Sequence, residues 1–142
     1  YGKGVKGNLA NLMRLINSGI PLPLNSIKNQ RSLIGIDNLV DILIRCIGHQ
    51  DSAGKTFLVS DGEDLSTPDL IRYIASSKGN SAILLPIPIF LIKLVGHVLR
   101  KQNEIDRLVG SLQVDIDYTC NLLNWKPPIS ISEGIKKMVK GL

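Results

Sequence analysis

Apolar positions recur along the chain at helical spacing in six stretches, which are separated by shorter apolar runs and polar turns. The spacing predicts helices over residues 8–18, 37–48, 66–78, 87–101, 115–123 and 130–141, and a short helical turn over 104–110. Short strands are predicted over 32–36, 56–60, 82–85 and 112–114, and an extended piece over 20–24, where two prolines exclude helix. Strands that alternate with helices predict an α/β fold with some parallel strands. Because the strands are few and short, they are more consistent with an addition to a larger sheet than with a complete doubly wound domain.

Serine residues mark the start of two of these helices. Ser66 is followed by Asp69 three positions later, and Ser130 is followed in the same way by Glu133. A serine N-cap with an acidic residue three positions on satisfies backbone N–H groups that the first helical turn leaves free. Asp115 is expected to cap the helix that ends at residue 123.

The composition is that of a folded globular unit. The chain has 142 residues, of which 44% are apolar and 20% charged, enough for one domain or part of a larger one. It opens at Tyr1 rather than at methionine, which favours a fragment. Cys46 and Cys120 lie far apart in apolar helical stretches, so we expect reduced thiols in a cytoplasmic protein, with neither a disulfide framework nor a metal site.

Positive charge is concentrated near the start of the chain. The net charge is +5, and residues 1–32 contain five basic side chains and no acidic one. A pI near 9.4 would suit nucleic acid, but the sequence has no aromatic-rich basic stripe and no recognisable nucleic-acid module. A bound phosphate group therefore fits better than a nucleic-acid partner.

The most apolar window runs from residue 82 to residue 99. It includes Pro86, Pro88 and Lys93 and is at the short limit for a bilayer span. We therefore expect no membrane span here, and the window predicts a buried or pocket-lining helix.

A glycine-rich motif opens the chain. Gly2, Gly4 and Gly7 match G-x-G-x-x-G, but no strand precedes them and no acid follows about 20 residues on, as a dinucleotide site requires. A phosphate-binding loop of another kind fits the motif better. In such a loop, Lys6 and the N-terminus of the helix would attract an anion, and the Asn8 amide would donate a hydrogen bond to it. A flexible surface loop without a ligand is the alternative.

Four blocks of sequence resemble the extended short-chain dehydrogenase/reductases, in the order that this family has them. Residues 1–9 resemble the end of the V-Y-G-P-G motif, with Lys3 in place of the usual proline, and residues 31–40 resemble R-[DS]-h-h-h-V-D-D-h-h, where h is hydrophobic. Residues 56–71 resemble the family's strand, glycine turn and helix start, and residues 115–127 resemble D-x-x-[KR]-x-x-x-x-L-G-W-x-P, with Asn124 in place of glycine. The whole chain is thus identified as the C-terminal, substrate-binding portion of a Rossmann-type nucleotide-sugar epimerase or dehydratase. It most resembles bacterial UDP-N-acetylhexosamine 4-epimerases and 4-keto reductases.

The resemblance implies a set of contacts to a UDP-sugar. By position, Asn8 and Arg31 would hold the diphosphate, Arg107 would add a second diphosphate or ribose contact, and the extended piece around Pro23 would face the uracil. Arg31 as a solvated surface residue and 20–24 as an edge strand without a ligand are the alternatives. In the helix over 87–101, Phe90 and Leu94 either line the sugar pocket or belong to a simple core helix, which the pattern favours.

The catalytic residues of this family are absent from the sequence. The family transfers hydride between the sugar and a nicotinamide with a Tyr-x-x-x-Lys motif, and none of the three tyrosines here begins one. The resemblance therefore implies that NAD or NADP is bound by a missing N-terminal domain, which is also this segment's partner, and that the segment alone is inactive. A homodimer is a further option, since dimers are frequent in the family. A non-catalytic nucleotide-binding or scaffold module of the same fold is the alternative function.

Overall fold

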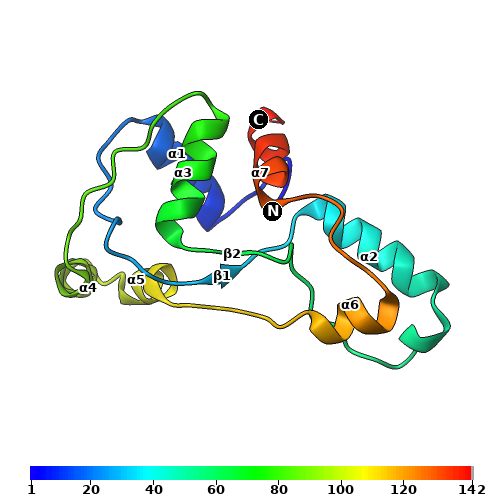
Figure 1. Ribbon diagram of the computed structural model, residues 1–142. Helices are drawn as coiled ribbons and strands as arrows, with labels where there is room; N and C mark the ends of the chain where they lie inside the picture. Colours follow the sequence, from blue (N-terminus) through cyan, green and yellow to red (C-terminus); the bar gives the residue numbers. More distant parts are fainter. Residues whose placement is uncertain (142) are drawn as a thin grey trace. The chain divides into compact units, whose positions relative to one another are not determined.

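The computed structural model describes residues 1–141, which are mainly helical (Figure 1). The α-helices are α1 (Asn8–Asn17), α2 (Ile36–Gly48), α3 (Thr67–Ser77), α4 (Ile89–Val98), α5 (Gln102–Val109), α6 (Asp117–Leu123) and α7 (Ile131–Lys140). A 3-10 turn, η1 (Gln50–Ser52), follows α2, and two short strands, β1 (Arg31–Ser32) and β2 (Asp64–Leu65), form a two-stranded sheet. Of the helices in this described part, none combines the length and the apolar character needed to span a bilayer.

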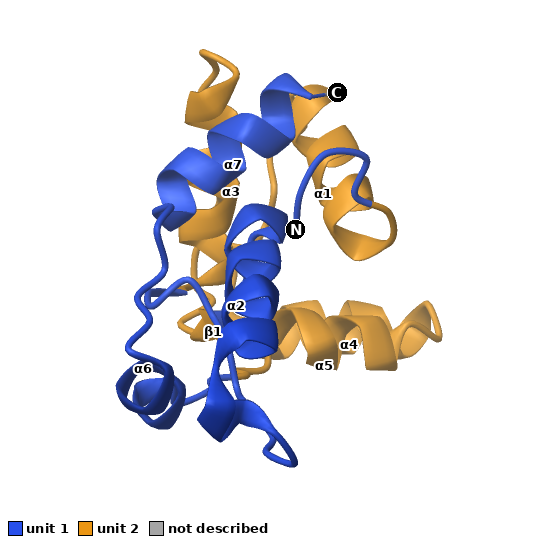
Figure 2. Cartoon of the chain, turned by 90° about the vertical axis from the view of Figure 1, so that its right-hand side faces the viewer, with its two compact units in different colours: residues 1–5, 32–64, 113–142 blue, residues 6–31, 65–112 orange. Residues whose placement is uncertain are grey.

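The chain divides into two compact units, each built from separate stretches of sequence (Figure 2). Unit 1 comprises residues 1–5, 32–64 and 113–142, and unit 2 comprises residues 6–31 and 65–112. Unit 2 carries ten basic and three acidic side chains, a net charge of +7, whereas unit 1 carries seven basic and nine acidic ones, a net charge of −2. The excess positive charge of the protein therefore resides in unit 2.

The core of unit 1 forms where α2 meets the segment around α6. Ile42, Leu123 and Trp125 are buried together, and the Trp125 indole donates a hydrogen bond of 2.7 Å to Asp41 Oδ2. The opposite side of α2 also carries large apolar side chains, and these are exposed: Val40, Leu43, Ile44 and Ile47. Helix α2 is therefore apolar on two sides, of which only one is covered within the unit.

Unit 2 contains two pairs of packed helices. In the first pair, α1 and α3 are in contact, and both contribute buried apolar residues such as Ile16, Ile71 and Ile74. In the second pair, α4 lies beside α5 (Figure 1). A Cβ atom at Gly96 of α4 would lie only 2.6 Å from Ile105 Cγ1 of α5. The glycine therefore permits the close approach of these two helices.

Most of the local signals for helices are confirmed. Ser66 Oγ accepts a hydrogen bond from Asp69 N at 3.2 Å, and Ser130 Oγ accepts one from Glu133 N, as the capping patterns predict. The prediction that Asp115 caps α6 is wrong in position: the N-cap is Ile116 and the helix begins at Asp117, although Asp115 Oδ1 accepts from the backbone N–H of Asp117 just before it. Asn124 ends α6 in the left-handed conformation with φ 44°, in the place where the family pattern has glycine. The helix predicted over 87–101 ends earlier, at Val98, and α5 follows it.

The strand predictions are only partly confirmed. The strand expected at 32–36 is reduced to β1, and those at 82–85 and 112–114 are reduced to single parallel bridges, Leu22 to Leu84 and Arg31 to Leu112. Residues 56–60 form no strand, so that prediction is wrong for this chain. A strand exists only when a neighbouring segment pairs with its backbone, and no segment within residues 1–141 does so here.

Candidate functional site

The best defined polar site of unit 2 forms where residues 29–31 lie along residues 107–112. The backbone N–H of Leu112 donates to the carbonyl of Gln30 at 2.9 Å, and Arg31 forms a parallel bridge with Leu112. The Ser111 hydroxyl accepts from the backbone N–H of Gln30 at 3.1 Å. These bonds hold the end of the 20–31 segment against the residues that follow α5.

Asn29 is the residue that clamps the two segments together. It is 3% exposed, and its amide nitrogen donates to the carbonyls of Leu108 at 3.2 Å and Gly110 at 3.1 Å. Its amide oxygen accepts from the backbone N–H of Thr67 at 2.8 Å, at the start of α3. The sequence alone does not indicate this role, because an asparagine in a polar turn carries no local signal of burial.

The Arg31 side chain reaches the backbone of Arg107 in this arrangement. A guanidinium nitrogen of Arg31 donates to the backbone carbonyl of Arg107 at 2.6 Å, which leaves the other N–H groups of that guanidinium for a ligand. Neither arginine belongs to an ion pair within the described residues. Two arginines on adjoining segments of a unit with net charge +7 make a favourable place for an anion.

Asn8 and Lys6 are exposed at the start of α1. Gly4 and Gly7, each with φ 73°, leave open space where a Cβ would lie, so the backbone on either side of Lys6 is accessible. No hydrogen bond within the described chain joins Asn8 or Lys6 to Arg31 or Arg107. The Arg31 guanidinium therefore contacts the segment that carries Arg107, and Asn8 and Lys6 are exposed donors at the start of α1.

Pro23 lines an apolar cavity of about 240 Å³ in unit 2. Its other lining residues are apolar side chains from the extended piece, α4, α5 and the segment before α4: Leu24, Ile87, Leu91, Ile92, Val95 and Ile105. Phe90 and Leu94 do not line this cavity, and they are 67% and 56% exposed. Helix α4 buries Ile92 and Gly96, but Phe90 and Leu94 are not core residues within the chain, and their alternative place in a sugar pocket stays a prediction.

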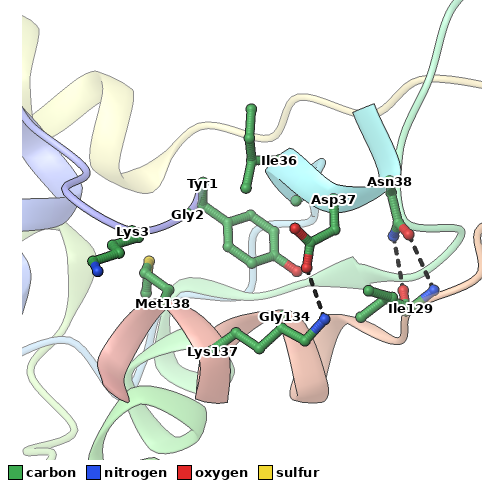
Figure 3. A pocket seen from close by; sticks show the side chains of 11 residues that line it. Tyr1, Gly2, Lys3, Ile36, Asp37, Asn38, Ile129, Gly134, Lys137 and Met138 are labelled. Carbon is green, nitrogen blue, oxygen red and sulfur yellow. Dashed lines mark hydrogen bonds and ion pairs between the residues drawn. The ribbon is translucent and has the colours of Figure 1, made fainter. Parts of the chain in front are cut away.

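A second cavity, of about 230 Å³, lies in unit 1 around Tyr1 (Figure 3). The Tyr1 ring fits between two glycines, since a Cβ at Gly134 would lie 2.5 Å from the phenol oxygen and one at Gly35 would lie 3.4 Å away. The phenol donates to the buried Asp61 carboxylate at 2.6 Å. At the edge of the cavity, the Lys137 ammonium and the Asp37 carboxylate form an ion pair of 2.8 Å, which Figure 3 shows.

Tyr1 is a structural residue rather than a catalytic base. Burial raises the pKa of its phenol far above the ordinary value, and the hydrogen bond to Asp61 and the charge of that carboxylate raise it further. A phenol that stays protonated cannot accept a proton from a substrate hydroxyl near neutral pH. Asp61 itself also accepts hydrogen bonds from Gly35 N and from the Asn38 amide, so its acceptor positions are occupied by the fold.

The opening glycine motif does not fit a dinucleotide. The residues around Gly2 form a turn closed by Val5 N and the Gly2 carbonyl at 3.2 Å, rather than a strand leading into a helix. The first acid after the motif is Asp37, which is paired with Lys137. Within residues 1–141 no group of three histidine, cysteine or acidic side chains is placed to bind a metal ion. Cys46 and Cys120 are free thiols, both partly buried.

Comparison with known proteins places this arrangement in context. No protein-family model matches the sequence. Among curated proteins, the chain is 49% identical over 138 residues to a UDP-glucose 4-epimerase of Vibrio cholerae. The match covers 96% of this chain and 42% of that protein, in its C-terminal part, so the chain spans less than half the length of this relative.

Three solved structures share the fold over 99% of the chain. UDP-glucose 4-epimerase of Thermotoga maritima, solved with UDP-glucose, has a TM-score of 0.66 at 16% identity, with 42% of that chain covered. RMD of Pseudomonas aeruginosa, complexed with NADPH, has a TM-score of 0.64 at 15% identity, with 44% covered. Pal of Bacillus thuringiensis has a TM-score of 0.65 at 20% identity, with 42% covered. The expected fold class, part of a Rossmann-type chain of the short-chain dehydrogenase/reductase kind, is confirmed.

Proposed function

We propose that this chain, which is 49% identical over 138 residues to a UDP-glucose 4-epimerase of Vibrio cholerae, is the part of a nucleotide-sugar epimerase of the extended short-chain dehydrogenase/reductase superfamily that holds the nucleotide diphosphate of a UDP-sugar. The observation that carries the proposal is the juxtaposition of Arg31 and Arg107. The Arg31 guanidinium is oriented by the Arg107 carbonyl at 2.6 Å, and Asn29 holds the two segments together. A planar guanidinium held in this way can make the paired hydrogen bonds that a phosphate group accepts.

The other contacts follow from the chemistry of the substrate. Arg107 supplies the second positive charge for the diphosphate, and Asn8 and Lys6 supply exposed donors at the start of α1. Pro23, on the wall of the apolar cavity, lies on the segment that would face the uracil. The relative and one of the structural neighbours are named as UDP-glucose 4-epimerases, which supports uridine as the base. The resemblance to enzymes of N-acetylhexosamines stays a prediction about the sugar.

Hydride transfer is assigned to a second half of the protein, which would bind NAD or NADP and carry the catalytic tyrosine and lysine. Two features of unit 1 support such a half. The exposed apolar side of α2, formed by Val40, Leu43, Ile44 and Ile47, is a surface that a neighbouring domain would cover. Residues 56–60 have the β-branched and aromatic composition of a strand but have no ladder partner within residues 1–141. We infer that the dinucleotide-binding half docks here, and that the 142-residue chain alone is inactive.

Calorimetric titration of the full-length protein with a UDP-sugar tests the diphosphate site. Arg31→Ala removes a charged hydrogen-bond donor and is expected to weaken binding by about 1.5 to 3 kcal/mol, roughly 10- to 150-fold. Arg31→Lys keeps the charge but loses the planar pair of donors, so it should recover only part of the affinity.

The matched control is Arg14→Ala. Arg14 is an exposed arginine on α1 of the same unit, and its guanidinium donates to the side chain of Asn11 at 3.4 Å. The control changes the net charge by the same amount and should leave affinity almost unchanged. If Arg31→Ala and Arg14→Ala bind the UDP-sugar equally well, while both melt like the parent protein, the assignment of Arg31 is wrong.

A further inference from the structure

Helix α4 exposes a continuous strip of large apolar side chains. Phe90, Leu94 and Val98 follow one another at intervals of four residues and are 67%, 56% and 72% exposed. Such spacing places the three side chains on one side of the helix. The opposite side packs inward through Ile92 and through Gly96, which lies against α5. This apolar strip, Phe90, Leu94 and Val98, is not used by the proposed nucleotide site.

Basic residues are placed at the end of the same strip. The chain leaves α4 through a closing turn in which Arg100 N donates to the His97 carbonyl at 3.1 Å and Lys101 N donates to the Gly96 carbonyl at 2.8 Å. This hydrogen-bond pattern needs a left-handed residue, which is usually glycine. Arg100 occupies that position with φ 55°. An arginine at this position adds a positive charge at the end of the apolar strip. Its left-handed conformation is strained, because glycine adopts that conformation more easily than arginine.

The surroundings of α4 favour an anionic partner. Unit 2 has a net charge of +7, and Arg100 and Lys101 are both exposed. The basic residue within the helix, Lys93, is 52% exposed and forms an ion pair of 3.5 Å with Asp106 of α5. With ten residues, α4 is too short to cross a bilayer, and no described helix of the chain can do so. A short helix with an apolar side and a basic end is typical of segments that lie in the headgroup region of an anionic membrane.

We propose that α4 is a membrane-surface helix, which inserts Phe90, Leu94 and Val98 among lipid chains while Arg100 and Lys101 contact anionic headgroups. This function is additional to the nucleotide site, which lies on other residues of unit 2. It would hold a nucleotide-sugar enzyme at a lipid surface. A second copy of the chain and another protein domain are the other occupants that the test distinguishes.

Co-sedimentation of the full-length protein with lipid vesicles tests the proposal. Vesicles of phosphatidylcholine mixed with phosphatidylglycerol should bind the protein, and vesicles of phosphatidylcholine alone should bind it much more weakly. The double variant Phe90→Ser with Leu94→Ser removes much of the buried apolar area and should lower partitioning by roughly tenfold or more. The matched control is Leu15→Ser with Ile20→Ser, which removes two exposed apolar side chains of the same unit outside α4 and should leave partitioning unchanged.

A second variant separates membrane binding from folding. Arg100→Gly removes a charge and also relieves the left-handed strain, so the protein should become more stable while binding anionic vesicles several-fold more weakly. Lys28→Ala is the control for the loss of one exposed positive charge elsewhere in unit 2. A stabilised protein that binds lipid less well cannot be explained by loss of structure.

Three results would overturn the proposal. The first is that the full-length protein binds neither kind of vesicle, which would mean that another part of the protein covers α4. The second is that the α4 variant and its control lose binding equally. The third is that the α4 variant changes a dimer into a monomer in light scattering, which would identify a second copy as the occupant. Calorimetric affinity for a UDP-sugar should be the same in parent and α4 variant, so failure here leaves the nucleotide site untouched.

Discussion

At the scale of single residues, buried polar side chains hold distant parts of each unit together. Asp61 accepts hydrogen bonds from the Tyr1 phenol at 2.6 Å and from the Asn38 amide at 2.7 Å. Asn38, 1% exposed, also bonds both backbone groups of Ile129. In unit 2, Asn29 has the same role between residues 67 and 110. A buried polar group with all its partners favours one arrangement of the chain, because any other arrangement leaves it unsatisfied.

The Tyr1 phenol makes the stability of the folded protein depend on pH in the alkaline range. Its pKa is raised in the folded state by burial and by Asp61, whereas in the unfolded chain it ionises near pH 10. The stability contributed by this group is therefore present below about pH 10 and is lost as pH rises further, by at most about 1.4 kcal/mol per pH unit. Tyr1→Phe should remove this part of the slope when unfolding by urea is measured at rising pH.

The control for this measurement is Tyr118→Phe, which removes a phenol from a side chain that is 55% exposed and stacked on Phe57. An equal loss of slope in the two variants would show that Tyr1 has no special part in the alkaline transition. At neutral pH, Tyr1→Phe should still cost about 1 kcal/mol, since the Asp61 carboxylate loses one donor.

At the scale of elements, helices could be predicted from the sequence and strands could not. The start of α3 at Ser66 and that of α7 at Ser130 depend on contacts within one helical turn, so the residues that determine them are adjacent in the sequence. The strand expected over 56–60 has the right composition, yet a strand needs a partner segment, and none lies within the described residues 1–141. The clamp by Asn29 was missed for a related reason, because its partners lie 38 to 81 residues away.

The ends of α4 and α6 offer a comparison between two left-handed residues. Arg100 after α4 has φ 55° and Asn124 after α6 has φ 44°. Asparagine tolerates this conformation better than arginine. Arg100→Gly is therefore expected to raise the free energy of unfolding by about 0.5 to 1 kcal/mol, and Asn124→Gly by a few tenths at most. Thermal unfolding of the two variants beside the parent protein measures the difference. A larger gain at Asn124 than at Arg100 would contradict this account of the strain.

At the scale of the whole molecule, positive charge and exposed apolar surface are unequally distributed. Unit 2, with a net charge of +7, carries the two arginines proposed for the diphosphate, whereas unit 1 is nearly balanced at −2. The sequence showed the basic start of the chain, but the units combine separate stretches, so the full asymmetry emerges only from the fold. The exposed apolar side of α2 in unit 1 is likewise invisible in the sequence, where all its apolar positions look like core.

Substitutions on the exposed apolar side of α2 are expected to affect the stability of the 142-residue chain and of the full-length protein differently. Leu43 and Ile47 are 54% and 87% exposed in the chain, so Leu43→Ser with Ile47→Ser should leave its stability nearly unchanged and raise its solubility. In the full-length protein the same side chains are expected to be covered by the dinucleotide-binding half. There the double variant should lower the free energy of unfolding by about 2 to 5 kcal/mol, because it buries two hydroxyls and removes apolar contacts.

Parallel urea unfolding of both proteins, each with and without the substitutions, measures this contrast. Leu15→Ser with Ile20→Ser is the control, since those side chains are exposed in unit 2 and outside the proposed docking surface. A destabilisation confined to the α2 variant of the full-length protein would identify α2 as the contact with the other half. If the α2 variant is as stable as the control in both proteins, the side chains of Leu43 and Ile47 remain in water in the complete enzyme, and the catalytic half must dock elsewhere.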